Sequence, residues 1–288
     1  MAYLASRAPI LLLLALSHLP SAQSTACVMP TRRPAPAERN YTSPAVEQLL
    51  AELVPRFKDP NLGALFFNTL PNTLDTTVYH HTSSPGAEDS FIITGDIPAS
   101  WHRDSTNQVW PYLRLVKNDS ALQSLFRGLI RRQAANVLRA PYANAFNLND
   151  TVWGPHKDDV VFPKTLNSSW VFEAKWESDS LSNVLRLASG YFNATGDTSP
   201  FDSTFISAVR LIMQTFREQQ LGSDEEDEGA GVKYSFQRAG GDPWEPTDRC
   251  ELRCVCVCVC VAEVPELDRW NVCGRATRCP SPFHPLQP

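Results

Sequence analysis

Apolar residues recur at spacings of three and four along much of the chain, which is the pattern of amphipathic helices. The clearest run lies between residues 119 and 141. Its apolar positions are Leu122, Leu125, Phe126, Leu129, Ile130, Ala134, Val137 and Leu138. Asp119 or Ser120 is placed to start this helix and Pro141 to stop it. The pattern therefore predicts one long helix in the middle of the chain.

Shorter apolar segments flank the long helix. Ser43 is placed to cap a helix that has Pro44 at its first position. Further segments are expected over residues 62–70, 104–116, 179–192 and 201–219. The helical pattern stops at residue 222, and residues 233–238 are typical of a short strand or extended segment. The fold class expected from this pattern is all-α.

The N-terminal region has the features of a secretory signal. Arg7 precedes an apolar run over residues 10–16, and small residues follow, so residues 1–22 are interpreted as a signal peptide. The run is shorter than the ~20 residues that span a bilayer, and no other stretch predicts a membrane helix. Residues 23–42 are rich in Pro, Arg, Ala and Thr and are interpreted as a linker. A globular body is expected over residues 43–249.

The last segment, residues 250–288, has a different character. Val and Cys alternate strictly over residues 255–261, as in the translation of a GT dinucleotide repeat. We interpret this tail as non-native and disordered, arising from a translated intron or a gene-model error. No cysteine lies between Cys27 and Cys250, so the body is expected to depend on packing rather than on disulfides.

Charge and motifs exclude several classes of function. The net charge is −5, which argues against nucleic acid as a partner. Phosphate-loop, dinucleotide, zinc-protease and calcium-loop patterns are absent from the sequence, so no cofactor or metal is expected. His80 and His81 are interpreted as surface residues because no further ligand stands at a suitable spacing. The sequence has N-glycosylation motifs at Asn40, Asn118, Asn149, Asn167 and Asn193, which predict a secreted or secretory-pathway glycoprotein.

The stretch ITGDIPASWHRDS, residues 93–105, has the most distinctive chemistry. Gly95 and Pro98 restrict the backbone and predict a shaped loop. Trp101 can cover the apolar face of a sugar ring, while Arg103 and Asp104 can bind its hydroxyl groups. A structural loop held by an Arg–Asp ion pair remains an equally open interpretation.

Three other polar stretches are candidates for the same site. In NTLDTTV, residues 72–78, Asp75 and Thr76 could line the rim of a site, or Asn72 or Asp75 could cap a helix. PYANAFN, residues 141–147, offers Asn144 for hydroxyl binding. VFEAKWESDSL, residues 171–181, contains Glu177 and Asp179.

These motifs, in this order, resemble glycoside hydrolase family 125, the metal-independent exo-α-1,6-mannosidases. The resemblance covers residues 43–249. It implies an (α/α)6 toroid that releases terminal mannose with inversion from α-1,6-linked mannosides, N-glycans or mannan. Two carboxyl groups ~6.5–9.5 Å apart perform such a reaction.

The resemblance also assigns roles to residues. Asp179 matches the family's general acid, although it could instead cap the helix that follows. A neighbouring Trp176 and Glu177 would both favour its protonated form. The remaining residues implied to bind substrate are Asp75, Thr76, Trp101, Arg103, Asp104, Asn144 and Glu177. His102 departs from the apolar residue expected between Trp101 and Arg103.

Part of the family pattern is missing. A six-hairpin toroid needs about twelve helices, and the sequence predicts about six. The family's catalytic base is a glutamate of the C-terminal half, and none of Glu251, Glu263 and Glu266 has a matching context. We therefore expect this product to contain only about the N-terminal half of the toroid and to be unstable and inactive. The alternatives are another inverting (α/α)6 glycosidase, a non-catalytic mannose-binding protein, or a fragment without function.

Overall fold

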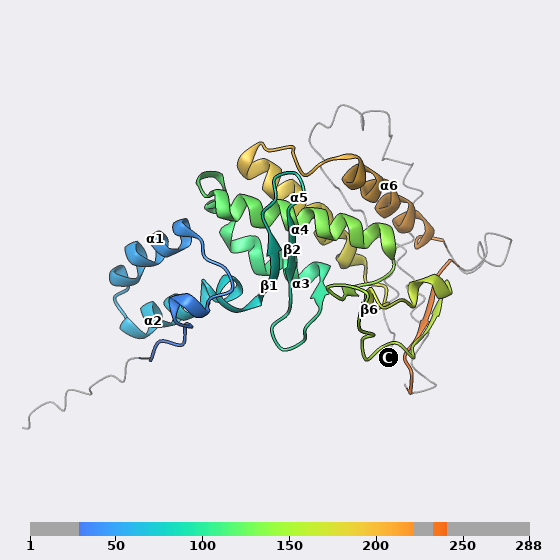
Figure 1. Cartoon of the computed structure of the whole chain (residues 1–288), viewed down its shortest axis with the longest axis horizontal. Helices are drawn as coiled ribbons and strands as arrows, with labels where there is room; N and C mark the ends of the chain where they lie inside the picture. The colour runs from blue at the N-terminus through green and yellow to red at the C-terminus, as the bar shows by residue number, and fades with distance from the viewer. Residues whose placement is uncertain (1–28, 222–232, 241–288) are drawn as a thin grey trace, which may run out of the picture.

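The structure is a computed structural model that describes residues 29–221 and 233–240. The predicted signal peptide, residues 1–22, and the predicted non-native tail, residues 250–288, lie outside these ranges. The described part is rich in helix, as predicted (Figure 1). Its α-helices are α1 (Pro44–Leu53), α2 (Pro60–Thr69), α3 (His102–Val109), α4 (Ser120–Arg139), α5 (Ser178–Thr195) and α6 (Ser203–Glu218). None of them is long and apolar enough to cross a membrane.

The two helix starts with the clearest sequence signals are confirmed. Ser43 Oγ accepts a hydrogen bond from Val46 N at the start of α1, and Asp119 accepts one from Leu122 N at the start of α4. Ser43 Oγ also donates to Asp119 Oδ2 at 2.6 Å. Burial alone would raise the pKa of Asp119. The hydrogen bonds stabilise its charged form by more than burial destabilises it, so the pKa is lowered. One buried carboxylate thus caps α4 and ties α1 to it.

Helix α3 begins at His102, before the expected start at Asp104 or Ser105, because Trp101 is extended and forms its N-cap. The predicted bend at Pro111 is present as the 3-10 turn η4 (Trp110–Arg114), which is followed by η5 (Val116–Asn118). Helix α5 ends at Gly196, whose φ of 72° favours glycine. The expected turn between α5 and α6 is therefore confirmed.

The all-α expectation missed several short strands. Strands β1 (Val78–Thr82) and β2 (Asp89–Ile92) form an antiparallel pair, as do β5 (Val160–Phe162) and β7 (Ser235–Gln237). Strands β3 (Ser100–Trp101), β4 (Ala145–Phe146) and β6 (Val171–Glu173) form a three-stranded sheet. Only β7 was anticipated. Strands β3 to β6 have two or three residues each, too few to show an alternating pattern.

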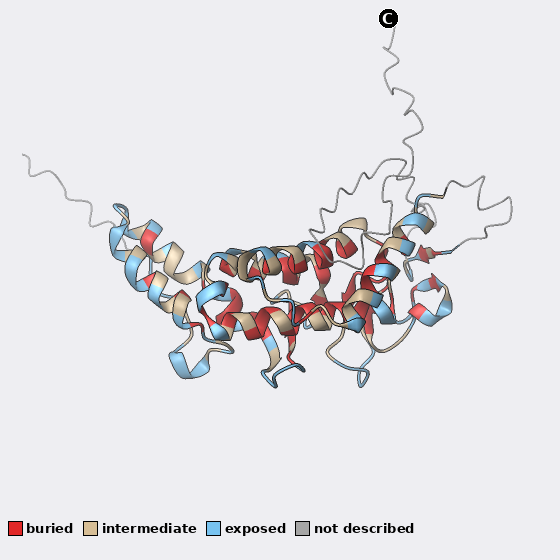
Figure 2. Cartoon of the chain, turned by 90° about the horizontal axis from the view of Figure 1, so that it is seen from above, coloured by how far each residue is buried: buried red, intermediate tan, exposed pale blue. Residues whose placement is uncertain are grey.

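Helix α4 is the centre of the packing. It contacts α6, α5 and strand β2, and its apolar face is almost fully buried. Its first half packs with α1, β1, β2 and the end of α5, and its second half with α6 and the start of α5. Figure 2 shows the buried residues along the middle of the molecule, on the sides of the helices that face one another.

The predicted linker, residues 23–42, is only partly within the described ranges. From residue 29 onward it makes fixed contacts, with the 3-10 turn η1 over Pro36–Glu38. Arg33 donates to both carboxylate oxygens of Asp75, at 2.7 and 3.0 Å, and to Glu47. Its side chain is buried. The linker interpretation therefore does not hold for residues 29–42, because a buried ion pair anchors them.

Gly128 lets α4 approach β2 closely. A Cβ atom at this position would lie 2.3 Å from Ser90 Oγ and 2.9 Å from backbone atoms of Asp89 and Ser90. We expect Gly128→Ala to lower the free energy of unfolding by about 1–3 kcal/mol, because the backbone of β2 must move. Urea denaturation would measure it.

Gly63→Ala in α2 is the matched control. There the new Cβ would meet atoms at 3.2 Å and beyond, and the higher helix propensity of alanine, worth up to about 1 kcal/mol, offsets the strain. Equal effects of the two substitutions would contradict the proposed close contact of α4 with β2.

Candidate active site

The small sheet β3–β4–β6 brings three sequence motifs together. Trp101 pairs with Ala145, and Ala145 pairs with Glu173. Each outer strand is followed closely by a helix, α3 after β3 and α5 after β6, and α3 packs along α5. The first turns of both helices therefore lie next to the same sheet.

Arg103 is the centre of the polar cluster at these helix starts. Its Nη1 lies 2.9 Å from Asp179 Oδ2 and 3.3 Å from Glu177 Oε2. Its Nε lies 3.5 Å from Asp104 Oδ2. The side chains of Arg103 and Asp179 are 40% and 45% exposed, so a ligand in solution can reach them. The structure thus brings together four of the residues predicted to act on substrate.

The surroundings of the cluster shift the pKa values of Arg103 and Glu177. The hydrogen bond to Asp179 raises the pKa of Arg103. Burial raises the pKa of Glu177, and the nearby Arg103 opposes that rise without cancelling it. Glu177 is therefore the carboxyl group of the cluster that holds a proton to higher pH than a free glutamate does. Ion pairs this exposed contribute only about 0–1 kcal/mol each to stability.

Trp101 forms an apolar wall beside the cluster. Its ring meets the edge of Phe172 at a centroid distance of 5.3 Å, over Ala99 and Ala145. Part of the ring remains exposed, as a sugar-stacking surface requires. The structural ion pair considered as an alternative, between Arg103 and Asp104 of the same loop, is also present, at 3.5 Å. The shorter contact of Arg103, at 2.9 Å, is with Asp179 outside the loop.

Asp179 lies in the first turn of α5, and the N-cap of that helix is Glu177. The alternative that Asp179 caps the helix is therefore wrong. Trp176, predicted to shield Asp179, packs instead in the core against Tyr142 and Phe216.

Asn144 is placed behind the cluster rather than in it. It has 0% exposure, and its Nδ2 donates to Glu173 Oε2 at 2.6 Å. Glu173 in turn accepts a hydrogen bond from Arg238. Burial would raise the pKa of Glu173, but Arg238 and Asn144 lower it. Sequence reasoning gave Glu173 and Arg238 no role, since pairing between such distant residues leaves no local signal.

Asp75 and Thr76 make their contacts elsewhere. Asp75 is 2% exposed and paired with Arg33, so its carboxylate is occupied. Thr76 Oγ1 donates to the carbonyl oxygen of Asn72. In the described ranges, neither residue forms a hydrogen bond or ion pair with a member of the Arg103 cluster. The helix-cap alternative also fails, because this segment is the short π-helical turn η3 (Thr73–Thr77), whose N-cap Asn72 makes no side-chain cap bond.

The two histidines differ from the expected surface pair. His81 stacks edge-on against Tyr41, and its ring nitrogens contact Ser90 Oγ and Ser124 Oγ. The surface interpretation is therefore wrong for His81, which packs between β2 and α4. Within residues 29–221 and 233–240 no group of three potential metal ligands occurs.

All five predicted glycosylation sites lie at exposed positions in the structure: Asn40, Asn118, Asn149, Asn167 and Asn193.

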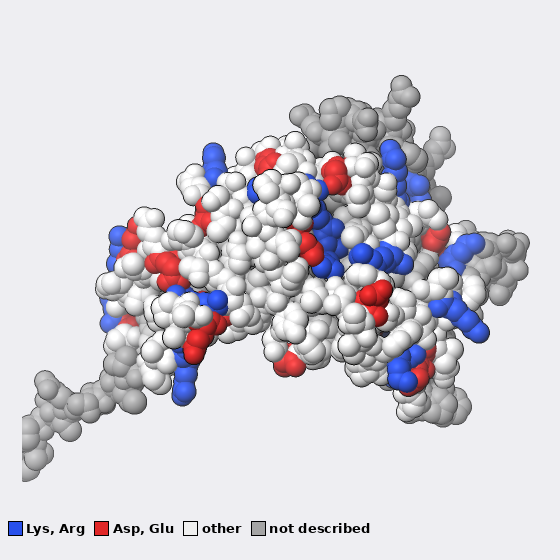
Figure 3. Space-filling model, in the orientation of Figure 1, with Lys and Arg blue, Asp and Glu red and all other residues white. Residues whose placement is uncertain are grey.

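Acidic and basic side chains lie next to one another across the face drawn in Figure 3.

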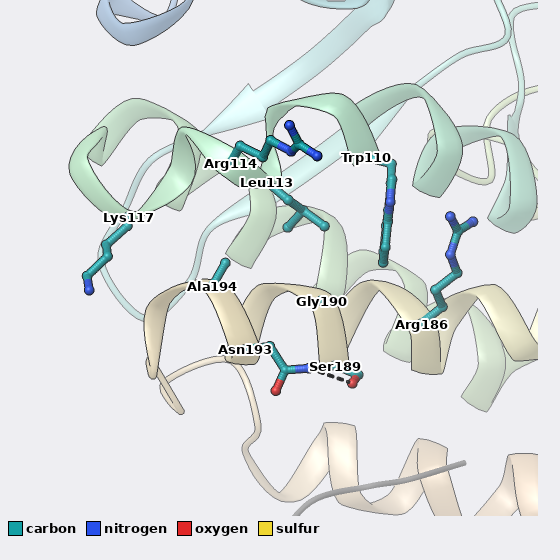
Figure 4. A pocket seen from close by; sticks show the side chains of 9 residues that line it. All are labelled: Trp110, Leu113, Arg114, Lys117, Arg186, Ser189, Gly190, Asn193 and Ala194. Carbon is teal, nitrogen blue, oxygen red and sulfur yellow. Dashed lines mark hydrogen bonds between the residues drawn. The ribbon is translucent and has the colours of Figure 1, made fainter. Parts of the chain in front are cut away.

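A separate groove of about 600 Å³ runs between η4 and α5 (Figure 4). Its lining residues are Trp110, Leu113, Arg114, Lys117, Arg186, Ser189, Gly190, Asn193 and Ala194. The Arg186 guanidinium lies 3.9 Å from the centre of a Trp110 ring, a cation–π contact. The groove contains none of the residues predicted to bind substrate.

The side chain of His102, at a position where an apolar residue was expected, has no polar partner in the described structure. It is buried and stacks on Phe146 at 4.9 Å, and both ring nitrogens lack a hydrogen-bond partner in the described structure. Burial lowers its pKa to about 3. The ring is therefore neutral at physiological pH and acts as an apolar packing group.

His102 should make the fold sensitive to acid. A histidine with a lowered folded-state pKa contributes stability above its unfolded pKa of about 6.5, and this stability is lost as the pH falls. Between about pH 6 and pH 4 we expect wild type to lose about 1.4 kcal/mol per pH unit more than His102→Phe. Denaturation at several pH values would measure it. Phe146→Leu is the control and should keep the wild-type pH slope; equal slopes for wild type and His102→Phe would contradict the interpretation.

Three comparisons with known proteins agree. The profile of a family described as metal-independent alpha-mannosidase (GH125) matches residues 59–251. The meiotically up-regulated gene 157 protein of Schizosaccharomyces pombe is 40% identical over 216 residues, which are 73% of this chain and 42% of that protein. A Streptococcus pneumoniae metal-independent alpha mannosidase, solved in a non-productive complex with alpha-1,6-mannobiose, is 35% identical with a TM-score of 0.59.

That match covers 69% of this chain and 43% of the bacterial one. The chain thus spans less than half the length of either relative. Because the family profile covers well over half of the sequence, the resemblance seen in the motifs is confirmed: the chain belongs to the GH125 family of metal-independent alpha-mannosidases.

Proposed function

We propose that this chain contains the mannose-binding part of an exo-acting α-1,6-mannosidase, with Asp179 as its general acid. The observation that carries the proposal is the contact of Arg103 with both Glu177 and Asp179, beside the half-buried Trp101. Arg103 can direct its remaining N–H groups at sugar hydroxyls. The α-1,6-mannobiose found with the bacterial relative supports this choice of linkage.

The reaction requires two carboxyl groups. Asp179 would protonate the leaving glycosidic oxygen while a second carboxylate activates water on the opposite face of the sugar. Glu177 Oε2 and Asp179 Oδ2 contact the same Arg103 Nη1 at 3.3 and 2.9 Å. These two oxygens therefore lie closer together than the ~6.5 Å minimum for an inverting pair. The base of an inverting reaction must be another residue, and we assign it to none in this chain.

The proposed architecture is the (α/α)6 toroid, of which the described helices would form part. Helices α3 and α5 would be inner helices, with their first turns at the mannose pocket. The proposed substrates are α-1,6-linked mannosides of N-glycans or mannan. Complete hydrolysis would need a base, and we assign none among the described residues, so we propose binding with little or no turnover.

Binding of α-1,6-mannobiose should depend on Arg103. We expect Arg103→Ala to weaken binding at least about ten-fold, because hydrogen bonds to charged groups contribute about 1.5–3 kcal/mol. Isothermal titration calorimetry would measure the affinity, with Arg114→Ala in the separate groove as the matched control. Equal affinity of Arg103→Ala and wild type would contradict the proposal, and equal affinity for an α-1,6-linked glucose disaccharide would favour another glycosidase.

Any turnover should depend on Asp179. We expect Asp179→Asn to reduce mannose release about 10²–10⁴-fold while binding changes little, because the amide cannot donate the proton. Release of mannose from α-1,6-mannobiose and the anomer formed would be measured by NMR. Turnover that Asp179→Asn leaves intact would refute the role of Asp179. Binding without turnover would agree with the proposal, whereas retention of configuration would implicate Glu177 as a nucleophile.

We also propose that the protein passes through the secretory pathway. The exposure of all five glycosylation motifs supports this localisation. Expression in a eukaryotic host should give a product whose mass falls on treatment with an N-glycan-removing amidase, and Asn→Gln substitution at each motif should identify the sites. An unmodified product recovered from the cytosol would refute the proposal.

A further inference from the structure

The backbone of Trp101 is fixed at the start of α3, two residues before Arg103. The residue is extended and forms the N-cap of the helix, and it pairs with Ala145 of β4. Its carbonyl oxygen accepts a hydrogen bond from Ser105 Oγ at 2.7 Å. These contacts determine where the side chain starts, but they leave rotation about its own bonds open. The tilt of the indole ring therefore depends on the side chains that it touches.

The indole ring of Trp101 meets a buried aromatic ring, that of Phe172 in β6. The two ring centres are 5.3 Å apart and the ring planes differ by 62°, an edge-to-face contact. The other buried residues of this small cluster are Ala99 and Ala145, whose methyl groups leave room for the ring to turn. Phe172 therefore limits the tilt of Trp101 more than these two alanines do.

Phe172 is also held by the loop that precedes β5. A Cβ atom at Gly154 would lie 3.1 Å from Phe172 Cδ2 and 3.2 Å from the Phe172 carbonyl oxygen, so the loop backbone runs against this residue. The ring of His156 meets that of Phe172 edge-on at a centroid distance of 5.4 Å. Arg238, which follows β7, donates a hydrogen bond to His156 Nδ1. A chain of contacts thus leads from β7 through the loop and Phe172 to Trp101.

We propose that Phe172 is a positioning residue, which fixes the tilt of the Trp101 ring as a stacking surface for a mannose unit. The inference deepens the proposed function and rests on it in taking Trp101 as part of the mannoside site. Trp101 is half-buried, so one part of its ring is packed while another can meet the apolar face of a sugar. A ring whose orientation is fixed beforehand loses less freedom on binding, which favours affinity.

A purely structural role for Phe172 gives a different expectation. A buried phenylalanine that only fills space lowers stability when it is shortened, and it affects sugar binding no more than other core residues do. The positioning role predicts a loss of affinity that depends on the presence of the Trp101 ring.

The first experiment is a double-mutant cycle, in which isothermal titration calorimetry measures binding of α-1,6-mannobiose to the full chain. We expect Phe172→Leu to weaken binding about three- to ten-fold, the range that an edge-to-face aromatic pair contributes. In a Trp101→Ala background the same substitution should cause no further loss. An equal loss in both backgrounds, or no loss in either, would overturn the proposal.

Phe126→Leu is the matched control for the cycle. Phe126 is also buried, and it stacks on Tyr191 in the part of the core around the first half of α4. Its substitution should lower stability and leave the affinity for α-1,6-mannobiose unchanged. An equal loss of affinity in Phe126→Leu and Phe172→Leu would overturn the proposal, because it would show a general effect of core substitutions.

The second experiment needs no sugar, so it separates this proposal from the proposed function. The chain is labelled with fluorotryptophan, and Trp101→Phe assigns the Trp101 signal in the ¹⁹F NMR spectrum. A soluble paramagnetic probe then reports how far the ring is exposed. We expect Phe172→Leu to increase the relaxation that the probe causes at Trp101, whereas Phe126→Leu should leave it unchanged. Unchanged relaxation in folded Phe172→Leu would overturn the positioning role, while failure of mannobiose binding alone would count only against the proposed function.

Phe172→Met keeps both experiments possible if Phe172→Leu does not fold. Methionine is flexible and fills irregular gaps in a core, but it has no flat ring edge. We therefore expect the same loss of affinity and the same increase in relaxation at Trp101. A folded Phe172→Met protein with wild-type affinity and wild-type relaxation would also overturn the proposal.

Discussion

The backbone pairing of β3, β4 and β6 is the constraint on which the site depends. These strands have only two or three residues each, yet they join three motifs that are far apart in the sequence. Because α3 and α5 start close to two of these strands, the pairing also determines where Arg103 and Asp179 stand. The packing of α3 along α5 acts with this pairing to fix the two helix starts relative to each other.

The polar groups around this sheet fall into an exposed and a buried set. The contacts of Arg103 are partly exposed and contribute little to stability, so a ligand can replace them at low cost. Asn144 is buried and Glu173 is largely so, and both are hydrogen-bonded. Leaving one unpaired would cost about 1–3 kcal/mol. The buried set can therefore keep its geometry while the exposed set exchanges partners.

The sequence predicted what depends on local patterns. Caps at Ser43 and Asp119, the stop near Pro141 and the turn at Gly196 act through neighbouring residues, and all were correct. The sheet was missed because strands of two or three residues are too short to show a period. Asp75 was wrongly assigned to the substrate site, because the local sequence around a carboxylate does not show whether it binds a ligand or a distant arginine such as Arg33. Only burial and long-range pairing separate those cases, and neither is visible locally.

The position of the carboxylates limits the chemistry that the cluster can perform alone. Asp104, Glu177 and Asp179 all contact one guanidinium group, so they approach a bound sugar from one side. An inverting hydrolase needs its acid and base on opposite faces of the ring. Burial raises the pKa of Glu177, and its contact with Arg103 holds it on the same side as Asp179. In the proposed function this cluster would be the acid side of the site, and the base would have to face it across the sugar.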